Sequence, residues 1–173
     1  MSGIDALKAG VLLLVAAVVQ ISLISYLRVA DGYPDVVLVL VVSIALLRGP
    51  LFGACAGFWA GLVLDVASFQ TLGLTSLLLT LTGYWCGRFG DATTRSSAHP
   101  PLIAVALATI AVALGSSLLH FMLGSSVPAS ELFGRVLLPT LALNLLVAYP
   151  LYRLCRRLFP PTQRARGEVS VAV

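Results

Sequence analysis

Charged residues are scarce in this chain of 173 residues. They make up 10% of it, while 59% is hydrophobic and the mean hydropathy is +1.01. Soluble domains carry roughly 25% charged residues, so this chain cannot cover a soluble fold of its size with charge. The same scarcity excludes a disordered chain and a nucleic-acid-binding protein. Three scattered cysteines do not form a disulfide framework. The class that remains is a polytopic membrane protein.

Six apolar blocks approach the length needed to cross a bilayer. A helix rises about 1.5 Å per residue, so a hydrocarbon core of roughly 30 Å takes about 20 residues. The blocks are continuous rather than alternating, which favours helices over a membrane β-barrel. We therefore predict an all-α integral membrane protein with six transmembrane helices, in residues 9–27, 36–47, 51–66, 72–87, 102–123 and 132–154. Residues 1–158 are expected to form this transmembrane domain, and residues 159–173 a short basic cytoplasmic tail.

Basic residues are unevenly divided between the two faces that six helices define. With both termini inside, nine Lys and Arg residues lie in the cytoplasm, and two, Arg28 and Arg135, lie outside. Because Lys and Arg accumulate on the cytoplasmic side, both termini are predicted to be cytoplasmic. A five-helix alternative leaves Arg48 near the middle of the hydrocarbon, at a cost of roughly 3 kcal/mol. Six helices place Arg48, Gly49 and Pro50 in a cytoplasmic turn, for which Gly and Pro are suited.

Small residues recur at intervals of four in the third block. Gly53, Gly57 and Gly61 are followed by Asp65, and helical geometry places all four on one stripe. In lipid, small residues at this spacing let another helix approach closely. Two interpretations stay open. The stripe packs against another helix of the same chain, or it forms a docking groove for a partner's transmembrane helix.

Two carboxylates lie at the outer ends of their helices in this topology. Asp35 opens the second helix after Pro34, where it can offset the helix dipole. Asp65 ends the third helix, where the dipole disfavours a carboxylate, so we expect it to have a polar partner. Together with Arg28, the two are predicted to form a polar cluster at the outer face.

Basic side chains follow the last apolar block. Arg153, Arg156 and Arg157 are predicted to contact anionic lipid headgroups, which attract basic residues at about 1 kcal/mol per charge. The cysteines and histidines lack metal-ligand spacing, and neither a nucleophile set nor a phosphate-binding loop is evident. We expect neither enzymatic activity nor a cofactor or metal.

The order of these features resembles the rod-shape-determining MreD family over residues 5–158. The similarity is carried by Pro34-Asp35, by the turn Leu46-Leu47-Arg48-Gly49-Pro50, by the glycine ladder from Gly53 to Asp65, and by Leu72-Gly73. The resemblance implies a noncatalytic scaffold of the bacterial elongation (rod) complex in the inner (plasma) membrane. It implies binding to the single-span periplasmic protein MreC, with the elongation glycosyltransferase/transpeptidase pair and MreB filaments as further partners. Cell-shape maintenance and peptidoglycan synthesis would be its context. A fold resembling the substrate-binding subunits of energy-coupling-factor transporters is also implied.

Two other functions stay open. A substrate-binding membrane subunit of a vitamin-type transporter requires a polar cavity, to which Asp65, His120 and Asn144 can contribute. A membrane enzyme requires acid, base or metal ligands gathered at one interface, and Asp35 with Asp65 is the candidate pair. A scaffold requires small-residue faces and few internal charges. Both are present, so we favour the scaffold.

Overall fold

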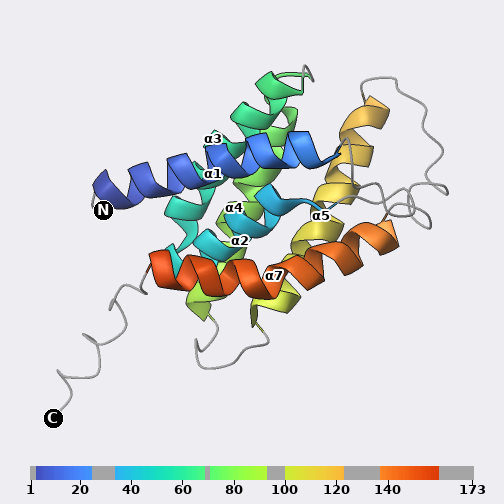
Figure 1. The fold of residues 1–173 in the computed structure, drawn as a ribbon. Helices are drawn as coiled ribbons and strands as arrows, with labels where there is room; N and C mark the ends of the chain where they lie inside the picture. Colours follow the sequence, from blue (N-terminus) through green and yellow to red (C-terminus); the bar gives the residue numbers. More distant parts are fainter. Residues whose placement is uncertain (1–2, 25–33, 69–70, 93–99, 123–136, 160–173) are drawn as a thin grey trace, which may run out of the picture.

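The computed structural model describes residues 3–24, 34–68, 71–92, 100–122 and 137–159. Within these ranges the chain is helical (Figure 1), with α1 (Gly3–Ile24), α2 (Val36–Arg48), α3 (Pro50–Ala67), α4 (Leu74–Ala92), α5 (Pro100–Met122) and α7 (Leu138–Leu158). Each helix overlaps one of the six apolar blocks. The all-helical prediction is therefore confirmed for the described part of the chain.

Four of these helices, α1, α3, α5 and α7, are long and apolar enough to cross a membrane. The other two differ in length or in composition. The apolar helix α2 has only 13 residues. The helix α4 carries Arg88 and Asp91 together with several Ser and Thr side chains. Of the six helices predicted to cross the membrane, four are thus long and apolar enough to do so, and α2 and α4 are not among them.

Helix α2 is the centre of the bundle, as its position between the other helices in Figure 1 illustrates. Every residue from Val37 to Leu47 is buried, and α2 contacts α1, α3, α4, α5 and α7. A helix that is apolar on all sides is expected in such a position. The outer helices expose many large apolar side chains, among them Leu7, Phe58 and Trp85, as a surface in contact with lipid requires.

The turn between α2 and α3 consists of one residue, Gly49. Gly49 adopts φ +93°, a conformation that side chains disfavour, and its N–H donates to the Ala45 carbonyl. Pro50 then occupies the first turn of α3, where its missing N–H costs nothing. The chain therefore reverses within one residue between two helices.

One end of the bundle gathers several chain segments. The amino end of α1 reaches the α2–α3 turn, because Asp5 forms an ion pair with Arg48 at 2.9 Å. Phe159, which follows α7, is fully buried, and its ring centroid lies 5.5 Å from the Arg48 guanidinium. Asp91, near the end of α4, lies beside Gly49. We call this the Arg48 end of the bundle. The remainder of the expected tail, residues 160–173, lies outside the described residues.

Candidate functional site

The glycine stripe of α3 lies against α4 of the same chain. A Cβ built on Gly53 would lie 2.5 Å from the Gly83 carbonyl oxygen, and one built on Gly57 would collide with the Leu79 backbone. A Cβ on Gly61 would collide with the Ser76 backbone. Such distances are shorter than real side chains allow, so these two helices meet backbone to backbone. The Ser76 hydroxyl adds a bond to the Phe58 carbonyl at 3.0 Å.

This packing decides between the two interpretations of the stripe. Gly53, Gly57 and Gly61 are all buried, and α3 and α4 form the most extensive helix pair of the bundle. The expectation that these glycines form a docking groove for a partner's helix is therefore corrected. Helix α4 packs directly on the three glycines, so they have no free surface for another helix.

Asp65 caps the connection from α3 to α4. It is 1% exposed, and its carboxylate accepts from the backbone N–H groups of Gly73 (2.8 Å), Thr75 (3.3 Å) and Ser76 (3.3 Å). These N–H groups stand at the start of α4, where a helix has no carbonyl partners of its own. The expected partner of Asp65 is therefore the amino end of the next helix, where a carboxylate is favoured by the dipole.

Asp35 belongs to a different group of polar residues. Its carboxylate caps α2 by accepting from the Leu38 N–H at 3.0 Å and also accepts from the Gln20 amide of α1 at 3.1 Å. The side-chain oxygen of Gln20 in turn accepts from the Val37 N–H at 2.8 Å. Asp35 stands at the start of α2, where the sequence placed it, and it caps the helix and also bonds to α1.

Asn144 of α7 extends this group across the bundle. Its side-chain oxygen accepts from the Asp35 N–H at 2.7 Å, and its amide nitrogen donates to the Thr109 hydroxyl of α5 at 3.1 Å. Thr109 itself donates to the Val105 carbonyl. We call Gln20, Asp35, Thr109 and Asn144 the polar network. It joins α1, α2, α5 and α7 through groups that satisfy one another.

The polar network lies inside the bundle rather than at its outer rim. The side chains of Gln20, Thr109 and Asn144 are all buried. Buried polar groups require hydrogen-bond partners, and the network supplies them.

The expected outer-face cluster is therefore divided. Asp35 bonds within the polar network and Asp65 caps α4, and the hydrogen bonds of the two carboxylates share no residue. Arg28 lies outside the described residues. Each carboxylate accepts hydrogen bonds from backbone N–H groups at the start of a helix, and that of Asp35 also accepts from the Gln20 amide.

The basic residues of α7 lie near the Arg48 end. Arg153, Arg156 and Arg157 are exposed, and the Arg153 guanidinium lies 4.9 Å from the centroid of the Tyr149 ring. Arg88, in the last turns of α4, is exposed as well. Contact of the α7 arginines with anionic lipids remains a prediction.

Several structural residues escaped the sequence reasoning. Gln20 and Thr109 look like ordinary polar substitutions within apolar blocks, and Asp5 precedes the first block. A signal was available for Gln20, because a buried amide in an apolar span needs a partner. Its partner Asp35, 15 residues later in the sequence, was not evident from spacing.

The helices, their exposed apolar faces and the capped turns define an all-helical protein, in the described residues, with four helices able to span a membrane. Comparison with protein families identifies it further. The family model described as rod shape-determining protein MreD matches residues 5–160. The chain belongs to the MreD family, whose members are membrane proteins of the cell-shape machinery. Comparisons with curated proteins and with solved structures found no match.

Proposed function

We propose that this chain is a noncatalytic scaffold of the bacterial rod complex, located in the plasma membrane, and that it binds the single-span protein MreC. The observation that carries the proposal is the family match over residues 5–160. Through MreC, the chain would support peptidoglycan synthesis by the elongation glycosyltransferase/transpeptidase pair and its coupling to MreB filaments. The role in rod shape determination follows from the family, and the partners are the proposed part.

The physical support for a scaffold is the way the bundle is held together. The α3–α4 pair is joined backbone to backbone, and the polar network ties four helices across the interior. Both leave the large apolar side chains facing outward. Helices associate in lipid through van der Waals packing of such surfaces. A rigid bundle with an apolar exterior suits the binding of a partner's membrane helix.

A scan with a photo-crosslinking amino acid tests MreC binding. One outward position on each outer helix would be replaced, using Leu7, Phe58, Trp85, Leu107 and Leu146, all of which are exposed. We expect crosslinks to MreC from one helix or from two adjacent helices, because a single helix covers one face only. Buried Leu38 of α2 is the control that should give none. Absence of an MreC crosslink at all five outward positions would contradict the proposal.

We further propose that the Arg48 end faces the cytoplasm, with both chain termini on that side. The end holds Arg48 and the amino end of α1, and the exposed Arg153, Arg156 and Arg157 follow close to the end of α7. Basic residues accumulate on the cytoplasmic side and attract anionic headgroups there. The proposed lipid contact of the three arginines rests on the same orientation.

A reporter fused after Val173 measures this orientation. A fluorescent protein that matures only in the cytoplasm is expected to be bright at this position, and alkaline phosphatase, active only in the periplasm, is expected to be silent. The same pair fused after Gly32, in the predicted outer loop, should give the reverse. Phosphatase activity after Val173 would contradict the proposed orientation.

The transporter alternative gains no support from the polar network. A solute-binding subunit needs polar groups available to a ligand. The side chains of Gln20 and Asp35 instead bond to each other and to N–H groups at the start of α2. The Asn144 side chain bonds to the Asp35 N–H and to the Thr109 hydroxyl. This arrangement is what a structural role requires.

A further inference from the structure

A stripe of large apolar residues on α1 faces away from the bundle. Its members are between 45% and 69% exposed, and they are Ile4, Leu7, Val11, Leu14 and Val18. The opposite face of α1 is buried against the other helices through Ala9, Leu13 and Ala16. We call the five exposed residues the α1 seam.

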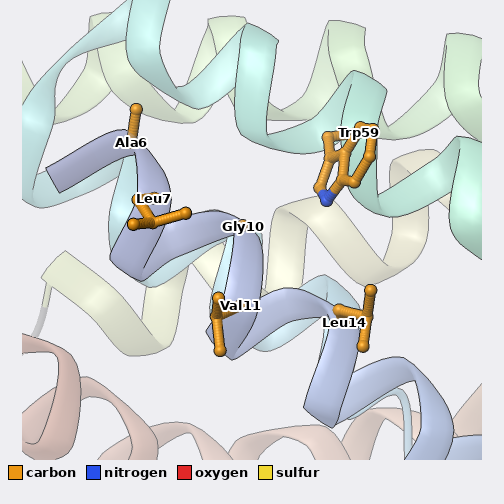
Figure 2. A pocket seen from close by; sticks show the side chains of 6 residues that line it. All are labelled: Ala6, Leu7, Gly10, Val11, Leu14 and Trp59. Atoms are coloured by element: carbon orange, nitrogen blue, oxygen red, sulfur yellow. The ribbon is translucent and has the colours of Figure 1, made fainter. Parts of the chain in front are cut away.

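An apolar groove between α1 and α3 lies along the seam (Figure 2). It has a volume of about 360 Å³, and its walls include Leu7, Val11 and Leu14 of the seam and Trp59 of α3. A Cβ added to Gly10 would meet only the indole nitrogen of Trp59, at 3.7 Å. The groove therefore leaves room beside the seam for the side chains of another helix.

The seam has the spacing of a coiled coil. Its residues follow one another at alternating intervals of three and four, which is the pattern of the a and d positions of a heptad. An average interval of about 3.5 residues keeps a seam facing one partner helix as the two helices wind around each other. From Ile4 to Val18 the seam advances about 21 Å, more than one leaflet of a hydrocarbon core about 30 Å thick. Fluid acyl chains cover any apolar surface and select no such spacing, so the pattern indicates a helix.

The residue types of the seam select the number and the direction of the paired helices. The a positions hold the β-branched Ile4, Val11 and Val18, and the d positions hold Leu7 and Leu14. This combination favours parallel, two-stranded coiled coils. Two copies of one chain insert into a membrane in the same orientation, so a two-fold axis along the membrane normal makes their α1 helices parallel. A second copy therefore presents an identical seam in the required direction.

The charged residues of α1 do not oppose this pairing. Lys8 is exposed and occupies an e position. In a parallel pair an e position faces a g position of the partner helix, and the nearest g positions here are Gly3 and Gly10. Two lysines therefore do not meet. Asp5 is turned to the other side of α1, where it pairs with Arg48.

We propose that the α1 seam is a homodimer interface, through which two copies of this chain pair as a parallel, two-stranded coiled coil in the membrane. The groove receives side chains of the second α1 next to Trp59. This inference does not depend on MreC. Its failure would leave the proposed scaffold function untouched, and failure of the MreC crosslinks would leave the pairing of the two copies untouched.

Two neighbouring valines of α1 provide a matched test in native membranes. Val18 belongs to the seam, whereas Val19 is similarly exposed but lies outside it. Each would be replaced by cysteine in a full-length protein whose Cys55, Cys86 and Cys155 have been changed to alanine, and the membranes would be oxidised with copper phenanthroline. We expect Val18→Cys to give at least fivefold more disulfide-linked dimer than Val19→Cys.

Energy transfer between copies measures the pairing without cysteines. Donor and acceptor fluorescent proteins would be fused after Val173, and the protein would be diluted with lipid in vesicles. Leu7→Ala combined with Leu14→Ala should raise the protein-to-lipid ratio at half-maximal transfer at least fivefold. Leu107→Ala combined with Leu118→Ala removes the same side chains from the exposed face of α5 and should leave that ratio unchanged.

Three results would overturn the proposal. Equal dimer yields from Val18→Cys and Val19→Cys would mean that the copies meet without using the seam. Unchanged energy transfer after the Leu7→Ala and Leu14→Ala changes would exclude the two leucines from the contact. A photo-crosslink from Leu7 to MreC, with none to a second copy, would assign the seam to MreC. All these substitutions replace exposed side chains, so the bundle is expected to fold, which circular dichroism would verify.

Discussion

Gly57→Ala is expected to destabilise the protein by about 1–3 kcal/mol, the usual cost of forcing an extra methyl group into a packed core. The new Cβ would collide with the Leu79 backbone of α4, which cannot rotate away as a flexible side chain can. Either α3 and α4 separate along their length, or the backbone of both shifts. A lower midpoint of thermal unfolding in detergent would measure the effect.

Gly10→Ala is the matched control for this substitution. It adds the same methyl group to an apolar helix, yet the new Cβ would meet only the Trp59 indole at an ordinary 3.7 Å. Both changes favour helix formation equally, so the difference between them isolates the α3–α4 contact. Equal midpoints for the two variants would show that α3 and α4 are not packed as described. A bulky residue at Gly57 is consequently expected to disrupt the fold, so loss of MreC binding in such a variant would not locate the binding surface.

Asp65→Ala is expected to have an effect of similar or larger size. Its carboxylate accepts three backbone N–H groups in a site that is almost fully buried. Removing it leaves donors without acceptors, at about 1–3 kcal/mol for each buried group that water cannot reach. The start of α4 should then fray, and hydrogen exchange at Thr75 and Ser76 should accelerate together with a fall in the thermal midpoint.

Asp65→Asn and Asp35→Asn are the comparison variants for the loss of stability in Asp65→Ala. The amide at position 65 keeps one acceptor oxygen, so its stability should lie between that of Asp65→Ala and the unmodified protein. Asp35→Asn keeps an oxygen able to accept from Leu38 and Gln20, and a smaller loss than for Asp65→Ala is expected. If Asp65→Ala proved no more destabilising than Asp35→Asn, the capping role assigned to Asp65 would be wrong.

The sequence was informative wherever the physics is local. Continuous apolar blocks predicted all six described helices, because a chain in lipid must satisfy its backbone hydrogen bonds within each segment. Gly49-Pro50 predicted the turn after α2, because only glycine accepts the positive φ found there and proline suits the first turn of a helix. Asp35 was expected at the start of α2, because a carboxylate there offsets the helix dipole.

Tertiary structure decided the contacts that join distant segments. The spacing of Gly53, Gly57 and Gly61 showed that some backbone would approach α3 closely, and only the fold identified it as α4. Asp35 and Asp65 were both expected at the outer ends of helices. The fold gives them separate partners, the start of α2 for Asp35 and the start of α4 for Asp65. The polar network depends on Asn144 lying beside a residue 109 positions earlier.

By itself, the sequence predicted a membrane protein, the approximate limits of its helices and close helix packing at the glycine ladder. Each of these features depends on length, apolarity or spacing along one segment. The fold alone decided that α2 is the buried centre, that α4 fills the glycine stripe and that α1 and α3 enclose an apolar groove. These depend on which surfaces meet. In an apolar chain many pairings bury similar area, so shape and a few polar contacts select among them.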